Sequence, residues 1–486
     1  MTATGVVLSQ MLIGGEWVDS LSGRVFDVEN PASRTVITAV PRAERADVDR
    51  AVAAAAGAFD SWRAMPARDR GRLLLRIGDD LEARAEEIGR LIASETGNAL
   101  RTQSRPEAVN SADVFRYFGA AAAEMKGQTI PLGEGLLNYT RREPLGVVAG
   151  IIPWNSPVLL GALKIAMALC TGNTLVLKAA EDAPLAVLRM AEVCQAHLPP
   201  GVLNVLTGYG EECGAALARH PQVAKVSFTG STEVGKEIVH ATADRVARVS
   251  LELGGKSPAI VFPDANEPQV VDGVIAGMRF TRQGQSCTAG SRLFLHEDIF
   301  EPFMQKLVDK LAALKVGDPL DEATDMGAII NARQFERVCS FVDEALQRGA
   351  TALIGGMPER DGDRDGYFIK PTVFTGIDNR WRIAREEVFG PVLVAIPWRD
   401  EKDAIRMANQ THYGLAAYVW CRDVSRALRT AHEIASGWVQ VNRGGGQLPG
   451  MHYGGFKESG WGREYAIEGA LDAFTEIKNV TVNLDF

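Results

Sequence analysis

The stretch Leu145–Lys178 reads LGVVAGIIPWNSPVLLGALKIAMALCTGNTLVLK. It contains an apolar run at Val147–Ile152, a helical segment at Val158–Ala168 and a second apolar run at Thr174–Leu177. Gly172 is a suitable stop for the intervening helix. Short apolar runs joined by one helix are typical of two parallel strands with a crossover connection. The stretch therefore predicts an α/β fold built on a parallel sheet.

The same alternation continues as far as Gly255. Further apolar runs lie at Leu203–Thr207, Lys225–Thr229 and Val249–Leu253, with helical segments at Pro184–His197, Glu211–Arg219 and Thr232–Thr242. We expect a Rossmann-like, doubly wound sheet, whose ligands bind beyond the carboxyl ends of the strands. After Pro258 the alternation resumes with new spacing, which predicts a second α/β domain.

The flanking segments have other patterns. Ala67–Gly97 repeats apolar residues at helical spacing and predicts one long amphipathic helix. Gly127–Arg142 and Phe474–Leu484 are rich in Thr, Ile, Leu and Val, and are expected to form extended strands. A chain of 486 residues is too long for one simple core, so two large domains, or two plus an appendage, are expected.

Composition argues against several classes of function. The net charge of −9 leaves no basic excess for nucleic acid. The most apolar long stretch, Pro157–Cys170, is interrupted by Lys164 and is too short to span a bilayer. The N-terminus lacks a basic start followed by a long apolar run, so we expect no signal peptide and a cytoplasmic protein. The six cysteines and seven histidines form no Cys-x-x-Cys or His-x-x-x-His pair, which argues against disulfides and a metal site.

Two phosphate-binding motifs are nearly present and both fail. Gly208-Tyr209-Gly210 would open a Gly-x-Gly-x-x-Gly motif, but Cys213 occupies the last position. Gly230–Lys236 has Walker A spacing, but Glu237 stands where Ser or Thr binds magnesium, so nucleotide hydrolysis is disfavoured. Backbone N–H groups at Thr229-Gly230-Ser231, just before a helix, can still hold a pyrophosphate.

Lys178 and Glu181 close a predicted strand. A lone K-x-x-E is most simply a surface ion pair. At the carboxyl end of a parallel strand, however, the pair can hydrogen-bond the ribose hydroxyls of a dinucleotide, and the carboxylate would repel a 2′-phosphate.

Asn155 and Glu252 also end predicted strands. Asn155 can cap the helix that follows it or donate from its side chain to an oxyanion. Glu252 lies within an apolar run, where a carboxylate either pairs with a buried cation, such as Lys256, or has a function. Because burial raises a carboxyl pKa toward neutrality, Glu252 is a candidate general base that can swing over Gly254 and Gly255.

One cysteine lies among small and polar residues, in FTRQGQSCTAGSR at Phe280–Arg292. Such surroundings leave the Cys287 thiol reachable, whereas an inert structural thiol more often lies among Val, Leu and Ile. Alone, the stretch is equally compatible with a loop cysteine that has no role. Three further motifs accompany it: LELGGKSP at Leu251–Pro258, IIPWNSP at Ile151–Pro157 and EEVFGPV at Glu386–Val392.

With these motifs in this order, the sequence resembles the aldehyde dehydrogenase superfamily from about Gly14 to the last strand-like segment. The resemblance implies an NAD(P)-dependent enzyme of the non-acylating, hydrolytic type. By the resemblance, Cys287 attacks the aldehyde carbonyl, and Asn155 and the Cys287 backbone N–H stabilise the oxyanion. Loss of hydride to NAD⁺ leaves a thioester, and Glu252 activates the water that releases the acid. Lys178 belongs to the same catalytic set.

The resemblance also implies a cofactor site and a substrate pocket. The cofactor would be NAD, with NADP disfavoured by Glu181. The cofactor contacts would be Ile151, Trp154, Lys178, Glu181, Gly210, Gly230, Ser231, Leu253, Glu387 and Phe389. The substrate pocket would be formed by Ser156, Leu160, Leu163, Ser286, Thr288, Gln447 and Tyr453.

Two pocket positions depart from the family pattern. Ser156 stands where many relatives have a large aromatic residue, and Ser286 where others carry Cys, Ile or Gln. A small residue at position 156 predicts room for a bulky aldehyde, aromatic or branched.

The resemblance further implies a division into domains and an assembly. Residues 1–126 and 143–255 would form the NAD-binding domain, 256–460 the catalytic domain, and 127–142 with 461–486 a small β arm for oligomerisation. The partners would be a small-molecule aldehyde and further copies of this chain, in a dimer or tetramer, with no nucleic acid and no membrane.

Three alternatives differ in class. An acylating relative would pass the thioester to coenzyme A, but such enzymes generally lack the glutamate that stands here as Glu252. A catalytically silent binding protein would have lost Cys287, Asn155 or Glu252, and all are present. A Cys–His hydrolase would need a histidine near Cys287, and His452, the one candidate, is far along the chain.

Overall fold

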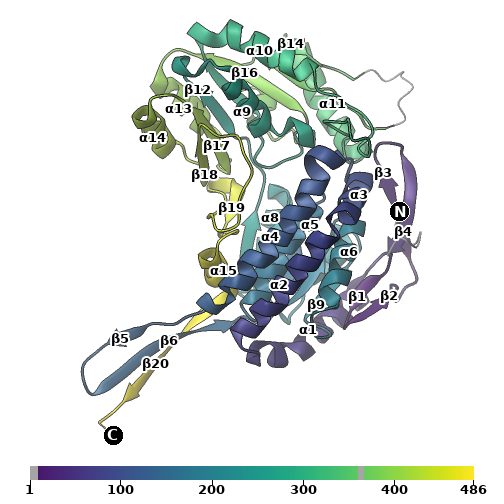
Figure 1. Cartoon of the computed structure of the whole chain (residues 1–486), viewed down its shortest axis with the longest axis vertical. Coiled ribbons are helices and arrows are strands. Elements are labelled where there is room, and N and C mark those ends of the chain that lie inside the picture. Colours follow the sequence, from purple (N-terminus) through teal and green to yellow (C-terminus); the bar gives the residue numbers. More distant parts are fainter. Residues whose placement is uncertain (1–8, 359–365, 486) are drawn as a thin grey trace.

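The computed structural model describes residues 9–358 and 366–485 (Figure 1). Residues 1–8, which begin the stretch used to judge a signal peptide, lie outside the described residues. The first sheet is parallel through its centre and has antiparallel strands at its edges. Its strands, in spatial order, are β19 (Gly460–Trp461), β11 (Arg248–Glu252), β10 (Val223–Thr229), β7 (Val147–Ile151), β8 (Thr174–Lys178), β9 (Leu203–Leu206), β1 (Met11–Ile13) and β2 (Glu16–Val18). The predicted doubly wound α/β sheet is confirmed.

Both faces of this sheet are covered by helices, which is why its central strands are apolar throughout. Val148 and Leu175 face one core, while their neighbours Val147 and Val176 face the other. The first core is closed by α2 (Ala67–Ala83), α3 (Ala85–Thr96), α4 (Arg105–Ala121), α5 (Pro157–Cys170) and α6 (Leu185–Gln195). The second is closed by α1 (Arg45–Ala64), α7 (Ala215–Arg219) and α8 (Thr232–Ala243).

The single helix predicted over residues 67–97 is wrong. The chain leaves helical geometry at Arg84, with φ −106° and ψ 14°, so that α2 ends and α3 begins there. The Arg84 side chain bonds Glu87 on α3 and Glu192 on α6. The apolar periodicity continues across the break because both helices pack on the same core.

The second sheet is also parallel, apart from one edge strand, and has its own helices. Its strands, in spatial order, are β14 (Thr351–Ile354), β15 (Thr372–Thr375), β16 (Val392–Trp398), β13 (Arg292–His296), β12 (Pro258–Val261), β17 (Ala416–Trp420) and β18 (Trp438–Val441). The helices around it include α9 (Pro268–Met278), α10 (Phe300–Ala312), α11 (Ala332–Gln347), α13 (Glu401–Asn409) and α14 (Val424–Glu433).

A three-stranded antiparallel sheet extends away from the body (Figure 1). It pairs β20 (Thr475–Asn483) with β6 (Leu136–Pro144), and β6 with β5 (Thr129–Pro131). The predicted extended segments are therefore strands of one ribbon. Before β20, helix α15 (Ile467–Phe474) packs against α5 and β11, within the body.

The two large sheets meet end to end. Strand β11 ends at Glu252, the chain crosses Gly254 and Gly255, and β12 starts the second sheet at Pro258. Beside β11, the first sheet has its topological switch point between β7 and β10, where chain order reverses. Ligands of doubly wound sheets bind at such a point, so the junction is the expected place for a site.

Candidate functional site

A cavity of about 610 Å³ lies at this junction. It is bounded by the segments that follow β7, β10 and β11, by the loop before β13, and by the loop after β18. Among the residues predicted from the sequence, its lining includes Trp154, Asn155, Ser156, Leu160, Gly230, Ser231, Glu252, Leu253, Ser286, Cys287, Glu387, Phe389, Gln447 and Tyr453. Segments distant in sequence thus converge on one space.

Cys287 lies in the tight loop between α9 and β13 and is only partly buried, whereas the other five cysteines are buried. Its Sγ atom is 3.5 Å from the Tyr453 hydroxyl. Burial raises the pKa of the Cys287 thiol to about 11, although the Tyr453 hydrogen bond opposes the shift. The loop packs closely on Gly255, where any side chain would come within 2.3 Å of the Cys287 carbonyl oxygen. The glycine of the LELGG motif therefore lets the thiol approach the end of β11.

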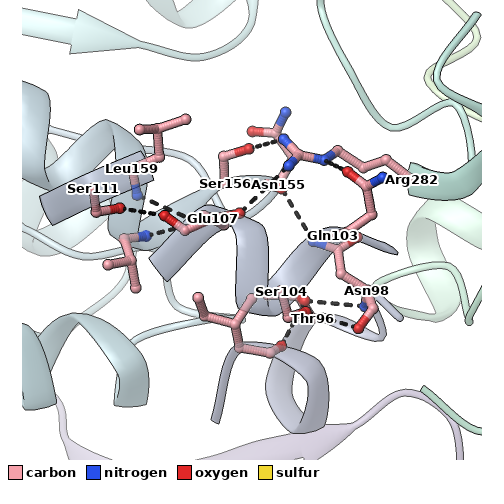
Figure 2. Close-up of polar contacts among 12 residues, drawn as sticks. Thr96, Asn98, Gln103, Ser104, Glu107, Ser111, Asn155, Ser156, Leu159 and Arg282 are labelled. Carbon is pink, nitrogen blue, oxygen red and sulfur yellow. Dashed lines mark hydrogen bonds and ion pairs between the residues drawn. The ribbon is translucent and has the colours of Figure 1, made fainter. Parts of the chain in front are cut away.

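Asn155 does not cap the helix that follows it. Its side-chain Nδ2 donates to the carbonyl oxygen of Gln285, at 3.0 Å, and its own carbonyl accepts from Asn98 (Figure 2). The residue before α5 is Ser156. An amide NH₂ has two N–H groups. The one not used by Gln285 is available for an oxyanion beside the Cys287 loop.

Glu252 is 5% exposed, and neither carboxylate oxygen has a hydrogen-bond partner among the described residues. The Oε1 atom of Glu252 packs against Gly454: a Cβ atom at position 454 would lie 2.9 Å from it. Burial raises the pKa of Glu252 well above its ordinary value, and the Glu464 carboxylate adds to the shift. Lys256, the cation that the sequence offers as a partner, makes no ion pair with Glu252 among the described residues. An unpartnered carboxyl facing a cavity fits a proton acceptor better than a structural ion pair.

Lys164 and Glu464 form a buried ion pair next to Glu252. Their side chains are 0% and 3% exposed. Lys164 opposes the rise in the Glu252 pKa. Sequence reasoning missed this pair, although a lysine that interrupts the apolar run at 157–170 was a signal that a buried partner exists.

One end of the cavity has the donor set that a dinucleotide needs. Ser231 caps α8 by accepting from the Val234 N–H, which leaves neighbouring N–H groups at this helix N-terminus for a pyrophosphate. Glu387 accepts from the Gly255 N–H at 2.9 Å, and burial raises the pKa of its carboxyl to about 7. The rings of Trp154 and Phe389 meet edge to face, 5.3 Å apart, at the same end. The residues present fit a nicotinamide dinucleotide.

Four predicted cofactor residues lie outside the cavity lining. Lys178 ends β8, in register with Ile151 of β7, and its Nζ is 2.6 Å from Glu181. Burial opposes ionisation of Glu181, but Lys178 outweighs it and lowers the pKa of that carboxyl. Gly210 opens a π-helical turn before α7 and has open space around it. All four lie at or just beyond the carboxyl ends of the parallel strands.

Two predicted pocket residues also do not line the cavity. Leu163 is 0% exposed within the first core, and Thr288 is 1% exposed, with its hydroxyl bonded to Ser286. Adjacent positions of a helix or loop face different ways, so these two side chains do not share the cavity with Leu160 and Ser286.

Arg282 donates to the Ser156 hydroxyl, a contact that no local feature of the sequence predicts (Figure 2). Its Nε donates to Gln103 Oε1 at 3.0 Å, and its Nη2 is 3.6 Å from Glu107 Oε2. Glu107 accepts from the backbone N–H groups of Val158 and Leu159, at the start of α5. Arg282 lies in the cysteine loop motif itself, but only the fold shows that it turns toward residue 156.

The described residues hold no cluster of three or more His, Cys, Asp or Glu arranged to bind a metal ion. None of the helices in ranges 9–358 and 366–485 combines the length and apolar character of a membrane span.

Comparison with known proteins gives the same family throughout. The model of the aldehyde dehydrogenase family matches residues 17–480. A hydroxyisobutyraldehyde dehydrogenase of Mycolicibacterium austroafricanum is 43% identical over 477 residues, which cover 98% of this chain and 94% of that protein. A phenylacetaldehyde dehydrogenase of Pseudomonas fluorescens is 42% identical, covering 97% of this chain and 95% of that protein.

Two solved structures have the same fold as this chain over nearly its whole length. PnpE in complex with nicotinamide adenine dinucleotide superposes with a TM-score of 0.96 at 41% identity, covering 99% of this chain and 98% of that one. The NAD⁺ complex of an aldehyde dehydrogenase from Bacillus cereus gives a TM-score of 0.96 at 38% identity, covering 100% and 99%.

Proposed function

This chain belongs to the aldehyde dehydrogenase family, and we propose that it oxidises an aldehyde to the carboxylic acid with NAD⁺ in the cavity between its two sheets. The observation that carries the proposal is the convergence of the Cys287 thiol, the Asn155 amide and the Glu252 carboxyl on one space. A thiol, an amide donor and a proton acceptor are the groups that this two-stage chemistry needs.

In the first stage, Cys287 is the nucleophile. Its sulfur bonds to the carbonyl carbon, and the carbonyl oxygen becomes the oxyanion of a thiohemiacetal. Asn155 Nδ2 and the Cys287 backbone N–H donate to this oxyanion. Because the thiol in its buried setting has a raised pKa, attack requires that its proton be removed as the substrate binds.

In the second stage, Glu252 acts on water. NAD⁺, when held in this site, would supply the hydride acceptor for oxidation of the thiohemiacetal to a thioester. Glu252 then takes a proton from water as the water oxygen attacks the thioester carbon, and the C–S bond breaks to release the acid. Its lack of other hydrogen-bond partners leaves Glu252 free to turn toward that water.

The cofactor would be held by side chains at the carboxyl ends of the first sheet. Ser231 and the start of α8 suit the pyrophosphate, and Lys178 with Glu181 suits a ribose diol. Glu387, Trp154 and Phe389 suit the nicotinamide half. Glu181 favours NAD over NADP because its charge repels a 2′-phosphate.

The substrate would be a bulky aldehyde, aromatic or branched, because Ser156 is small. Two relatives named for phenylacetaldehyde and hydroxyisobutyraldehyde support this size class. Activity confined to the smallest aliphatic aldehydes would contradict it.

The assembly would be a cytoplasmic homodimer or homotetramer. The ribbon of β5, β6 and β20 carries exposed apolar side chains, including Leu136, Leu137 and Ile477, which an oligomer would cover. The chain would divide into an NAD-binding domain, a catalytic domain and an arm formed within residues 127–142 and 461–486. Because α15 packs in the body, β20 would supply the arm's C-terminal strand.

The test is NADH absorbance with a panel of aldehydes, each supplied with NAD⁺ or NADP⁺. Cys287→Ala should lower activity on the order of 10³-fold or more, because it removes the nucleophile. Cys421→Ala, which removes a buried thiol elsewhere, is the matched control and should keep activity. Silence of the unmodified enzyme across a broad panel, with cofactor still bound, would contradict the proposal.

A further inference from the structure

We propose that Arg282 selects the substrate: its guanidinium binds a carboxylate carried by the aldehyde, at the end remote from the reacting carbonyl. The proposal rests on the proposed function and names the substrate class of that same site. The preferred substrates would then be aldehyde acids whose body fits beside Ser156.

Arg282 is built into the wall of the cavity. It lines the same space as Cys287 and Ser156. Its side chain is 17% exposed. A buried guanidinium at a pocket wall costs desolvation free energy unless an anion or several acceptors satisfy it.

The fixed contacts of Arg282 orient the guanidinium without using all of its donors. Nε donates to Gln103, and Nη1 donates to Ser156. The distance from Nη2 to Glu107 Oε2, 3.6 Å, is too long for a hydrogen bond. An arginine has five N–H groups in a planar fork, so donors remain for a ligand carboxylate.

Glu107 forms an ion pair with Arg282 from outside the cavity lining, so the guanidinium still faces the cavity. The Oε1 atom of Glu107 is used by the N–H groups of Val158 and Leu159. Burial raises the pKa of the Glu107 carboxyl to about 7, so near neutral pH Glu107 offsets only part of the Arg282 charge. Figure 2 shows the Glu107 side chain, which comes from α4, between Arg282 and Leu159 at the start of α5.

Two further arginines lie near this wall of the cavity, whose lining also includes the carboxyls of Glu252 and Glu464. Arg279 donates to the carbonyl oxygen of Gly445, and the Arg443 side chain lies against the same glycine. Gly445 stands two residues before Gln447, which lines the cavity. Neither arginine makes a salt bridge with a carboxylate among the described residues. Local positive charge near a pocket raises the concentration of anionic substrate there.

The experiment compares an acid with its methyl ester, which lacks the charge and carries one extra methyl group: 4-formylbenzoate and methyl 4-formylbenzoate. The unmodified enzyme should have the higher kcat/KM for the acid, by about tenfold. Arg282→Gln should lower the acid-to-ester ratio by about 10- to 100-fold, mainly through KM for the acid. Arg282→Lys keeps a charge but not the fork, and should lower the ratio less.

Two other variants separate recognition from structure. Glu107→Gln removes the competing negative charge, so the ratio should stay or rise. Arg406→Gln, on the exposed face of α13, is the matched loss of an arginine and should keep the ratio. A ratio that falls with Glu107→Gln, or stays constant in Arg282→Gln while both substrates lose activity, would assign Arg282 a purely structural role.

A second readout needs no turnover. Without cofactor, 4-formylbenzoate should protect Cys287 from iodoacetamide at lower concentration than its ester, and Arg282→Gln should abolish the difference. An ester preference in both assays would overturn the proposal while leaving aldehyde oxidation intact. Absence of Cys287-dependent NADH with any aldehyde would instead reject the proposed function, and the protection assay would still decide whether Arg282 selects an anion.

Discussion

Two lysine–glutamate pairs lie near the site and differ in how the chain brings them together. Lys178 and Glu181 are three residues apart, at the end of β8, with side chains 3% and 32% exposed. Lys164 and Glu464 are separated by 300 residues, and their side chains are almost fully buried. One pair is visible in the sequence as a short motif, and the other exists only after folding.

The difference in burial predicts a difference in role. Water can hydrate Glu181 if its partner is lost, so the first pair is free to serve a ligand. Both members of the second pair are almost fully buried, so each offsets the desolvation cost of the other. The buried pair also acts on chemistry, because Glu464 raises and Lys164 lowers the pKa of the neighbouring Glu252 carboxyl.

Lys164→Met should have the largest effect on stability. It leaves the Glu464 charge buried without a partner, which costs about 3–5 kcal/mol of unfolding free energy. The measurement is the midpoint of chemical denaturation. Lys178→Met breaks the other pair and should cost about 0–1 kcal/mol.

A double variant sharpens this prediction. Lys164→Met combined with Glu464→Leu removes both charges and should recover much of the loss, because an apolar pair needs no desolvation of ions. Equal losses for Lys164→Met and Lys178→Met would show that burial does not separate the two pairs.

Glu464→Gln should change the pH dependence of Glu252 with a smaller effect on stability, since the amide oxygen can still accept from Lys164. Glu464 is second to burial among the causes that raise the pKa of Glu252. Its loss lowers that pKa, so the carboxylate persists to lower pH and the acid limb of thioester hydrolysis moves to lower pH. At pH values below the limb, the rate of thioester hydrolysis should rise about tenfold for each unit by which the Glu252 pKa falls.

The measurement is turnover of p-nitrophenyl acetate, which acylates a cysteine without any cofactor. Glu468→Gln, an exposed glutamate on α15, is the control and should leave the limb in place. Movement of the limb to higher pH in Glu464→Gln would contradict the electrostatic coupling.

Much of the fold was accessible from the sequence because its signals are local. The buried strands of the first sheet, such as Val147–Ile151, are apolar runs separated by helices, and that alternation alone indicates a parallel sheet. The break at Arg84 was missed because both helices share one apolar periodicity. The packing of α15 in the body was not predicted, because its contact with α5 depends on tertiary structure and not on a local sequence pattern.

The site divides in the same way. Asn155 and Glu252 stand in short motifs at the carboxyl ends of β7 and β11, and Cys287 stands in a short motif in the loop before β13. Arg282 and Glu464 were missed because their partners lie on other elements, so their burial and contacts are set by tertiary packing.

Glu181→Gln should have the smallest effect on stability and a specific effect on the cofactor. It removes the negative charge beside Lys178, so repulsion of a 2′-phosphate is lost while the lysine remains to attract it. The ratio of kcat/KM for NADP⁺ to that for NAD⁺ should rise about tenfold, with unfolding free energy changed by at most about 1 kcal/mol. Glu192→Gln, which removes a similarly exposed carboxylate paired with Arg84, between α2 and α3, and with Arg189 on α6, should leave the ratio unchanged. A stability loss equal to that of Lys164→Met, with no change in cofactor preference, would place Glu181 with the buried pair and remove it from the cofactor site.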